Sequence, residues 1–489
     1  MLLASVDLGS NSFRIEIGRV QGDRILHQSY WKESVRLSAG FDENGNLTEE
    51  VQAKALATLA RFNERIKTFS PSQVRAVGTQ ALRIAKNSKE FLQKAEEVLG
   101  FPIEILRGHE EARLVFEGCS YRLPSSDAKR FIVDIGGGST EFVIGQGHKA
   151  EQCVSYHVGC VNTTLENFPD GIITDQRFET AQLYVQSEIM EAYSEFNSSN
   201  WQEAYGSSGT MDAISSILRT MGLSEEGEVR LEHLKALRQL LVKQGNISEL
   251  DLPGLADNRR EVIIGGLVVL SAVFNTLKIE VMSPCTGALR VGLLYDLLDR
   301  KTHQDIREES ANALLKWTGV DQDQAQRVQS LALKFFDQAC PNAPSESRKL
   351  LAWASLLHEI GGLISHNGYH RHTAYVLANC DLDGFSRPNQ ECLSMLALAQ
   401  RGNLLKVETA LGKPIARAQI ISIRLAVLFA HTRLPIEMPQ CLLSSDQDCF
   451  KLSIPTQWLK QHPLTHFLLE NEVVLWNKVK YGFELKLID

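Results

Sequence analysis

Two short segments of the chain combine an aspartate with a run of glycine, serine and threonine residues. In the first segment Asp7 is followed by Gly9, Ser10, Asn11 and Ser12, and in the second Asp134 is followed by Gly136, Gly137, Gly138, Ser139 and Thr140. Glycine and hydroxyl residues in a tight turn can direct several N–H and O–H donors at one phosphate. Carboxylates repel phosphate, so we expect the two aspartates to hold a divalent cation such as Mg²⁺.

The two segments share their surroundings as well as their residue types. Taken alone, either one is equally consistent with an ordinary tight hairpin. The same order of parts, however, is repeated between residues 3–20 and 131–147: a strand that ends in aspartate, a turn and a second strand. The repeat predicts two similar α/β domains that face each other across a cleft, with one phosphate-binding turn from each.

The remaining pattern divides the chain into a mixed part and a helical part. Apolar spacing predicts helices over residues 49–67, 90–99 and 108–119, and strands over 74–78 and 102–106. From about residue 302 the spacing is mostly helical, and the tail alternates at 449–454 and 483–488. We therefore predict two α/β domains, an all-α domain and a small α+β cap, with boundaries at 1–124, 125–301, 302–440 and 441–489.

Composition and charge narrow the class of protein. The net charge of -8 gives the chain no general basic character, so no nucleic-acid partner is expected. The nine cysteines include no pair separated by two residues, which is typical of reduced thiols in the cytosol. The N-terminus lacks the pattern of a signal peptide, and the apolar run at 262–274 is too short to span a bilayer. We expect a cytoplasmic location.

Five motifs together carry a resemblance to a known family. They are VDLGSNSF at 6–13, GTQALR at 78–83, GHEEARL at 108–114, IVDIGGGSTE at 132–141 and GSSGT at 206–210. In this combination and order the chain resembles the exopolyphosphatase/guanosine pentaphosphate phosphatase family, in its long form. That family belongs to the sugar kinase and actin superfamily, so the resemblance implies two actin-like α/β domains.

The resemblance assigns roles that the residues alone do not. It implies that Glu111 is the general base that activates water, although GluGluAlaArg at 110–113 alone is more typical of a solvated helical face. It also implies that Arg83 contacts the phosphate chain and that Glu141 helps to place the metal or the water. The segment with Gly206, Ser208 and Gly209 would line the cleft, where related kinases bind adenosine.

The implied activity is Mg²⁺-dependent hydrolysis of the terminal phosphate of inorganic polyphosphate, with guanosine pentaphosphate as the alternative substrate. An ATP-dependent kinase and a non-catalytic sensor of the same fold remain further alternatives. A requirement for K⁺, a homodimer and peripheral membrane association are implied by the resemblance alone.

The C-terminal half contains a group of histidines. His358, His366, His370 and His372 lie near Glu359 in the sequence, and the family's third domain resembles HD phosphohydrolases, whose signature is an adjacent His–Asp pair. Here the pair is His358–Glu359, and the longer glutamate need not place its oxygens on the same metal. A metal site and a structural or anion-binding role both remain open.

Overall fold

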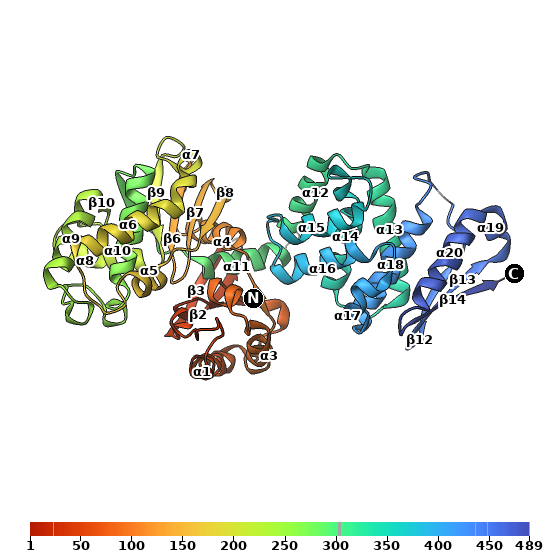
Figure 1. The fold of residues 1–489 in the computed structure, drawn as a ribbon, viewed down its shortest axis with the longest axis horizontal. Helices are drawn as coiled ribbons and strands as arrows, with labels where there is room; N and C mark the ends of the chain where they lie inside the picture. The colour runs from red at the N-terminus through yellow and green to blue at the C-terminus, as the bar shows by residue number, and fades with distance from the viewer. Residues whose placement is uncertain (23, 302–304, 436, 447, 489) are drawn as a thin grey trace. The chain divides into compact units, whose positions relative to one another are not determined.

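The chain divides into two compact units, residues 1–305 and 306–489 (Figure 1). The computed structural model describes residues 1–22, 24–301, 305–435, 437–446 and 448–488. Within these ranges no helix is both long enough and apolar enough to cross a membrane.

The first unit begins with a lobe built on a five-stranded sheet of order β3-β2-β1-β4-β5. The strands are β1 (Leu2–Leu8), β2 (Ser12–Gln21), β3 (Arg24–Ser34), β4 (Val74–Gly78) and β5 (Ile103–Ile105). The helices of this lobe are α1 (Glu49–Ile66), α2 (Gln80–Ile84) and α3 (Ser88–Leu99). Thr48 caps α1 by accepting a hydrogen bond from the Val51 N–H, and the apolar face of α1 is buried, as its spacing predicts.

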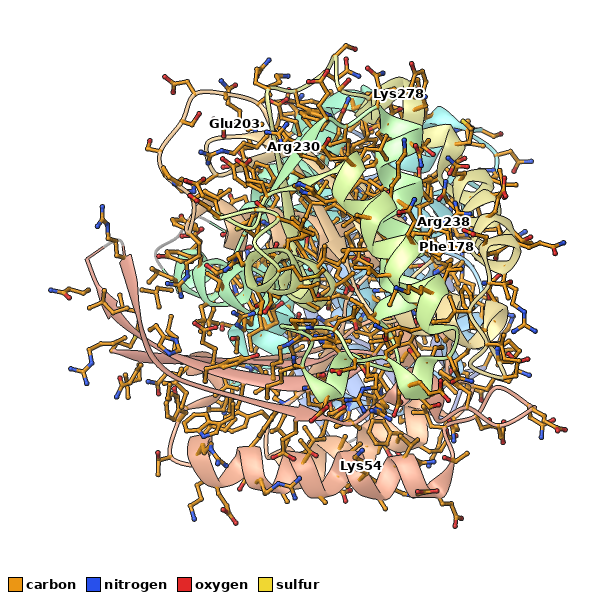
Figure 2. The ribbon with its side chains drawn as sticks, turned by 90° about the vertical axis from the view of Figure 1, so that its left-hand side faces the viewer. Lys54, Phe178, Glu203, Arg230, Arg238 and Lys278 are labelled. Carbon is orange, nitrogen blue, oxygen red and sulfur yellow. The ribbon has the colours of Figure 1, made fainter. Side chains whose placement is uncertain are left out.

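A second lobe repeats this arrangement on a six-stranded sheet of order β10-β11-β9-β6-β7-β8. Its strands are β6 (Arg130–Ile135), β7 (Thr140–Gln146), β8 (Lys149–Tyr156), β9 (Glu203–Ser207), β10 (Val229–Arg230) and β11 (Val281–Pro284). Its helices are α5 (Cys160–Asn167), α6 (Asp175–Ile189), α7 (Tyr193–Phe196), α8 (Ser208–Thr220), α9 (Leu231–Gln244) and α10 (Ile263–Leu277). On its surface the α9 side chain of Arg238 covers the ring of Phe178 in α6 (Figure 2). The two mixed sheets fit the predicted pair of actin-like domains.

Two helices connect the lobes, because each follows the sheet of one lobe and packs on the sheet of the other. Helix α4 (Gly108–Ser120) follows the first sheet but packs on β7 and β8, whereas α11 (Leu289–Lys301) follows the second sheet and packs on β1 and β2. The two helices cross at small residues: a Cβ on Gly292 would lie 1.9 Å from the Leu114 carbonyl oxygen, and one on Gly118 would lie 2.3 Å from that of Ala288. The glycines therefore allow a close backbone approach that fixes the position of α4.

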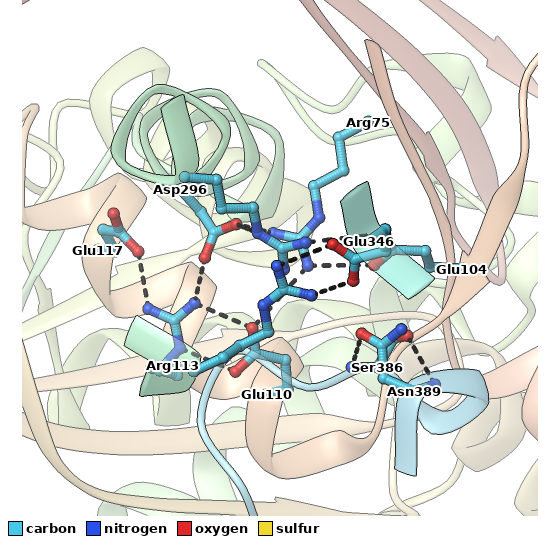
Figure 3. A network of polar contacts seen from close by, with 11 residues as sticks. Arg75, Glu104, Glu110, Arg113, Glu117, Asp296, Glu346, Ser386 and Asn389 are labelled. Atoms are coloured by element: carbon cyan, nitrogen blue, oxygen red, sulfur yellow. Dashed lines mark hydrogen bonds and ion pairs between the residues drawn. The ribbon is translucent and has the colours of Figure 1, made fainter. Parts of the chain in front are cut away.

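A buried ionic network fastens this crossing (Figure 3). Arg113 of α4 donates hydrogen bonds to Glu110 and Glu117 on its own helix and to Asp296 of α11, at 2.8–2.9 Å. Arg75 of β4 donates to the other oxygen of Asp296 at 2.5 Å. The segment 110–113 is therefore not the solvated face that its charges suggest, because all four of its residues are buried.

The second unit consists of helices followed by a small sheet. The helices are α12 (Ile306–Thr318), α13 (Gln322–Ala339), α14 (Ser345–Leu356), α15 (Tyr369–Asn379), α16 (Arg387–Ala399), α17 (Glu408–Leu411), α18 (Pro414–Phe429), α19 (Thr456–Gln461) and α20 (Pro463–Trp476). The strands β12 (Leu442–Asp446), β13 (Cys449–Pro455) and β14 (Gly482–Ile488) form one sheet in that order. A single hydrophobic core extends from Ala311 in α12 to Phe483 in β14.

Candidate active site

A polar cavity of about 260 Å³ lies in the first unit, between the two glycine-rich turns. Most of the residues singled out in the sequence line it, although they come from both lobes and from α4. They are Asp7, Gly9, Ser10, Asn11, Ser12, Glu111, Asp134, Gly136, Gly137, Ser139, Glu141, Ser208 and Gly209.

Four of the expected binding residues lie outside the lining of this cavity: Arg83, Gly138, Thr140 and Gly206. The Thr140 hydroxyl donates to the Val158 carbonyl at 2.5 Å, so it holds the turn and does not face a ligand. A Cβ on Gly138 would lie 2.1 Å from Gln80 Oε1, and one on Gly206 would lie 2.6 Å from the Met211 side chain. These two glycines allow close packing behind the cavity.

The two turns approach each other closely. A Cβ on Gly137 would lie 3.2 Å from the Cβ of Asn11 and 3.3 Å from that of Ser10. The Gly136 N–H donates to the Ser139 carbonyl at 2.9 Å and closes the second turn, while the Ser10 hydroxyl accepts from the Ala81 N–H at the start of α2. Part of each turn therefore maintains its shape, and only the remaining donors of the turns are available to a ligand.

Strand register places the side chains beside the turns in two equivalent rows. In the first lobe Asp7 pairs across the strands with Arg14, and Arg14 pairs with Lys32. In the second lobe Asp134 pairs with Glu141, and Glu141 pairs with Ser155. Paired residues on adjacent strands point to the same face of the sheet. The first row thus adds two cations to the cavity, and the second row adds a carboxylate.

Glu111 enters the cavity from the first turn of α4. Its Oε2 accepts a hydrogen bond of 2.6 Å from Arg83, which also donates to the Leu106 carbonyl at 2.9 Å. Burial raises the pKa of Glu111, Arg83 opposes this shift, and the nearby Asp7 adds to it. Arg83 therefore holds and tunes this carboxylate instead of lining the cavity.

The other carboxylates of the cavity are also perturbed. Burial raises the pKa of Asp134 to about 7, against the lowering effects of Ser208 and Arg14. The pKa of Glu141 is raised well above its ordinary value by burial first, and then by repulsion from Glu111 and Asp134. Glu111, Asp134 and Glu141 thus repel each other in a buried site, and a bound cation would relieve this repulsion.

These carboxylates fit a Mg²⁺ ion. The Oδ1 atoms of Asp7 and Asp134 are buried and have no hydrogen-bond partner, although Asp7 Oδ2 accepts from Arg14 at 3.0 Å. Mg²⁺ is commonly held by one or two carboxylates, with water and substrate phosphates completing its shell. Such a Mg²⁺ site needs fewer protein ligands than a metal site whose ligands all come from the protein. In the described ranges no group of three or more His, Cys, Asp or Glu residues has a metal-binding arrangement. The described histidines near His358 therefore form no such metal-binding group either.

Several cavity residues were not among the sequence-derived candidates. They are Lys32, Arg259, Arg290, Tyr30 and Asp212, which line the cavity beside Arg14, the residue that the sequence already offers as a further phosphate contact after the first turn. Burial, followed by repulsion from Arg259 and Arg14, lowers the pKa of Lys32 to about 8. A Cβ on Gly209 would lie 1.5 Å from the Arg259 guanidinium, so this glycine makes the approach of Arg259 possible. The alternation of β3 is the signal that could have indicated Lys32 in the sequence.

Ser208, at the start of α8, has a backbone φ of 73°, in the left-handed region that serine rarely adopts. Its hydroxyl bonds to Asp134 and lowers the pKa of that carboxyl. Strained backbone of this kind is concentrated at ligand sites, where the surroundings hold it in place.

Comparison with known proteins gives one consistent result. The family model of the Ppx/GppA phosphatase family matches residues 21–301, and that of the Ppx/GppA phosphatase domain III matches residues 306–473. Among solved structures, an exopolyphosphatase-like protein is 26% identical with a TM-score of 0.55, covering 60% of this chain and 97% of its own.

Two further structures show the same fold. An exopolyphosphatase from Cytophaga hutchinsonii is 23% identical with a TM-score of 0.55, over 61% of this chain and 98% of its own. The PPX-GPPA enzyme of Aquifex aeolicus is 24% identical with a TM-score of 0.51, over 60% and 99%. Both glycine-rich turns and the buried Glu111 line one cavity, and the chain belongs to the Ppx/GppA phosphatase family of enzymes.

Proposed function

We propose that this chain is an exopolyphosphatase, which hydrolyses the terminal phosphate of inorganic polyphosphate with the help of Mg²⁺ and releases orthophosphate. One observation carries the proposal: Glu111 is a buried carboxylate with a raised pKa that faces a cavity lined by both phosphate-type turns. A raised pKa makes a carboxylate a stronger base towards water.

The residues of the cavity divide the work of the reaction. The unshared donors of the turns, including the Asn11 amide, would hold the terminal phosphoryl group. Asp7 and Asp134 would hold Mg²⁺, which supplies charge neutralisation at the phosphate when it is bound, and Glu141 would help to place the metal or the attacking water. Glu111 would orient the attacking water and accept its proton. Positioning and charge stabilisation account for most of the catalysis of phosphoryl transfer, so no covalent nucleophile is required.

The cations of the cavity favour a polymer of phosphates as substrate. Arg14, Lys32, Arg259 and Arg290 gather in one cavity, and the repulsion of Lys32 by its neighbours is relieved when an anion binds. A chain of phosphates offers negative charge at every unit, whereas a nucleoside offers none. Guanosine pentaphosphate remains the alternative, since it presents the same terminal phosphate.

The substrate assignment is tested by phosphate release from three compounds in the presence of Mg²⁺. Long-chain polyphosphate is expected to give the highest kcat/KM, followed by guanosine pentaphosphate, with ATP lowest. A higher kcat/KM for guanosine pentaphosphate would reverse the assignment. Transfer from ATP to an added acceptor would favour a kinase, and release from none of the three would favour a sensor.

The role of Glu111 is tested by Glu111→Gln, which keeps the shape of the side chain and removes the base. We expect kcat to fall by about 10²–10⁴-fold with little change in KM, because a general base acts in the transition state. The exposed helical residue Glu97 offers a matched control, and Glu97→Gln should leave both parameters unchanged. Near-normal turnover in Glu111→Gln would show that Glu111 is not the general base.

The positioning role of Arg83 predicts a shift in the pH profile. Arg83 lowers the pKa of Glu111, so Arg83→Met should raise it. The base works only when deprotonated, and the acid limb of the kcat profile should therefore move to higher pH. If instead Arg83 contacted the phosphate chain, the substitution would raise KM and leave the acid limb in place.

A further inference from the structure

The second unit contains a cavity of about 390 Å³ that the proposed reaction does not use. Four apolar side chains of its lining, Val427, Leu428, Leu468 and Leu475, come from α18 and α20 and are called the apolar wall here, although Arg424 and Glu472 of the same helices also line the cavity. The lining also includes His358, Tyr369 and Gln400, which are called the polar wall here. A volume of this size, with an apolar wall and a few convergent polar groups, is typical of a site for a small organic ligand.

The buried polar wall presents hydrogen-bond acceptors that have no donor. Gln400 is 2% exposed; its Nε2 donates to the carbonyls of His358 and Ala397 at 2.7 and 3.0 Å, while its Oε1 has no partner. The carbonyl contacts fix the orientation of the amide, because the reverse orientation would place oxygen against oxygen. Gln400, which lines the cavity, therefore holds a buried acceptor that has no hydrogen-bond partner among the described residues.

His358 offers a second acceptor beside the first. It is 1% exposed, burial lowers its pKa, and Nδ1 lies 2.8 Å from the Ser355 carbonyl. A carbonyl only accepts, so Nδ1 carries the proton and Nε2 carries the lone pair. Nε2 lies 3.9 Å from Glu359, too far for a hydrogen bond.

The cavity also contains one cation that is not neutralised by a carboxylate. Arg424 is paired with Glu472, and Arg433 is paired with Glu359 at 2.5 Å. Arg401 is exposed and lies 5.5 Å from the ring centroid of Tyr369, with no acidic partner among the described residues. An arginine held by an aromatic ring keeps its donors available to an anion.

We propose that this cavity binds a nucleoside phosphate whose base carries an exocyclic amino group. The two N–H donors of the amino group would satisfy Gln400 Oε1 and His358 Nε2, the planar ring would lie on the apolar wall, and Arg401 would bind the phosphate. Unpaired acceptors in a buried wall reject a ligand that cannot donate to them, which gives the site its selectivity. The proposal is independent of the substrate assigned to the first unit.

The test measures binding to the full-length protein by equilibrium dialysis, with adenosine monophosphate as probe. Arg14→Gln weakens the phosphate turns of the first unit, and we expect it to leave this binding unchanged. Arg401→Gln is expected to raise Kd by about tenfold or more, through loss of a charge-assisted contact. Arg371→Gln removes an exposed arginine outside the cavity lining and serves as the matched control, with less than about a twofold change expected.

Ligand selectivity gives a second test that does not depend on folding of a variant. Ribose 5-phosphate and uridine monophosphate, which lack the amino group, should compete about tenfold more weakly than adenosine or cytidine monophosphate. Gln400→Met should abolish this preference in protein whose thermal unfolding is unchanged. The proposal fails if no saturable binding occurs, if ribose 5-phosphate binds as tightly as adenosine monophosphate, or if Arg14→Gln removes the binding while Arg401→Gln keeps it.

Discussion

The β1–β2 and β6–β7 hairpins share their strand order, their turn length and the aspartate before the turn, but the residues opposite those aspartates differ in charge. Arg14 faces Asp7 at 3.0 Å in the first hairpin, and Glu141 stands opposite Asp134 in the second. The adjacent strand then adds Lys32 in the first lobe and Ser155 in the second. A repeated scaffold has thus produced one cationic wall and one acidic wall.

This difference suits a reaction at a phosphate that is bound together with a metal. In the proposed reaction the cationic wall would attract the phosphate chain, and the acidic wall would suit a divalent cation beside the reacting group. Ser155 supports the acidic wall, because its hydroxyl donates to Glu141 at 2.8 Å. Two identical walls would either repel the substrate or offer no site for the cation.

Of the three changes proposed here, removing the charge of the acidic wall should have the largest effect on activity. Glu141→Gln is expected to lower kcat by about 100-fold and to raise the Mg²⁺ concentration for half-maximal activity by about 10- to 100-fold. Phosphate release is measured across a Mg²⁺ titration. Glu151→Gln, at an exposed position on β8, is the control. An unchanged Mg²⁺ requirement would show that Glu141 does not serve the metal.

Removing the charge of the cationic wall should act on substrate binding instead. Arg14→Gln is expected to raise KM by about tenfold, the value of one charge-assisted contact, with a smaller change in the Mg²⁺ requirement than Glu141→Gln gives, because Arg14 also bonds to Asp7. Arg19→Gln, at an exposed position on the same strand, should alter neither value. A change in Mg²⁺ requirement equal to that of Glu141→Gln would mean that the two walls have the same role.

The smallest effect is expected in the pH dependence of substrate binding. The pKa of Lys32 is about 8, so its positive charge is present below that pH and is lost as the pH rises through it. The KM for polyphosphate should therefore increase a few-fold above about pH 8. Lys32→Arg keeps its charge and should abolish this inflection, whereas Lys54→Arg on the exposed face of α1 should not. An inflection that persists in Lys32→Arg belongs to another group.

The spacing of apolar residues along the sequence predicted much of the fold, because the period of that spacing shows which face of a helix or strand is buried. The helix over 49–67 appears as α1 with Val51, Leu59 and Phe62 in the core, and the strand over 74–78 appears as β4. The two aspartates and their turns were visible because each turn is a continuous segment. The role of Glu111 came from the family resemblance, since its charged neighbours indicated a solvated face.

The sequence by itself determined that two glycine-rich turns exist, that each follows an aspartate at the end of a strand, and that a mixed part precedes a helical one. Tertiary structure decided that Arg83 holds Glu111, that Gly209 makes room for Arg259, and that Arg113 is buried against Asp296. It also decided that Gln400 and His358 form one polar wall. Each of these contacts joins residues brought together by packing between elements, and no local periodicity encodes which distant side chain will share a buried site.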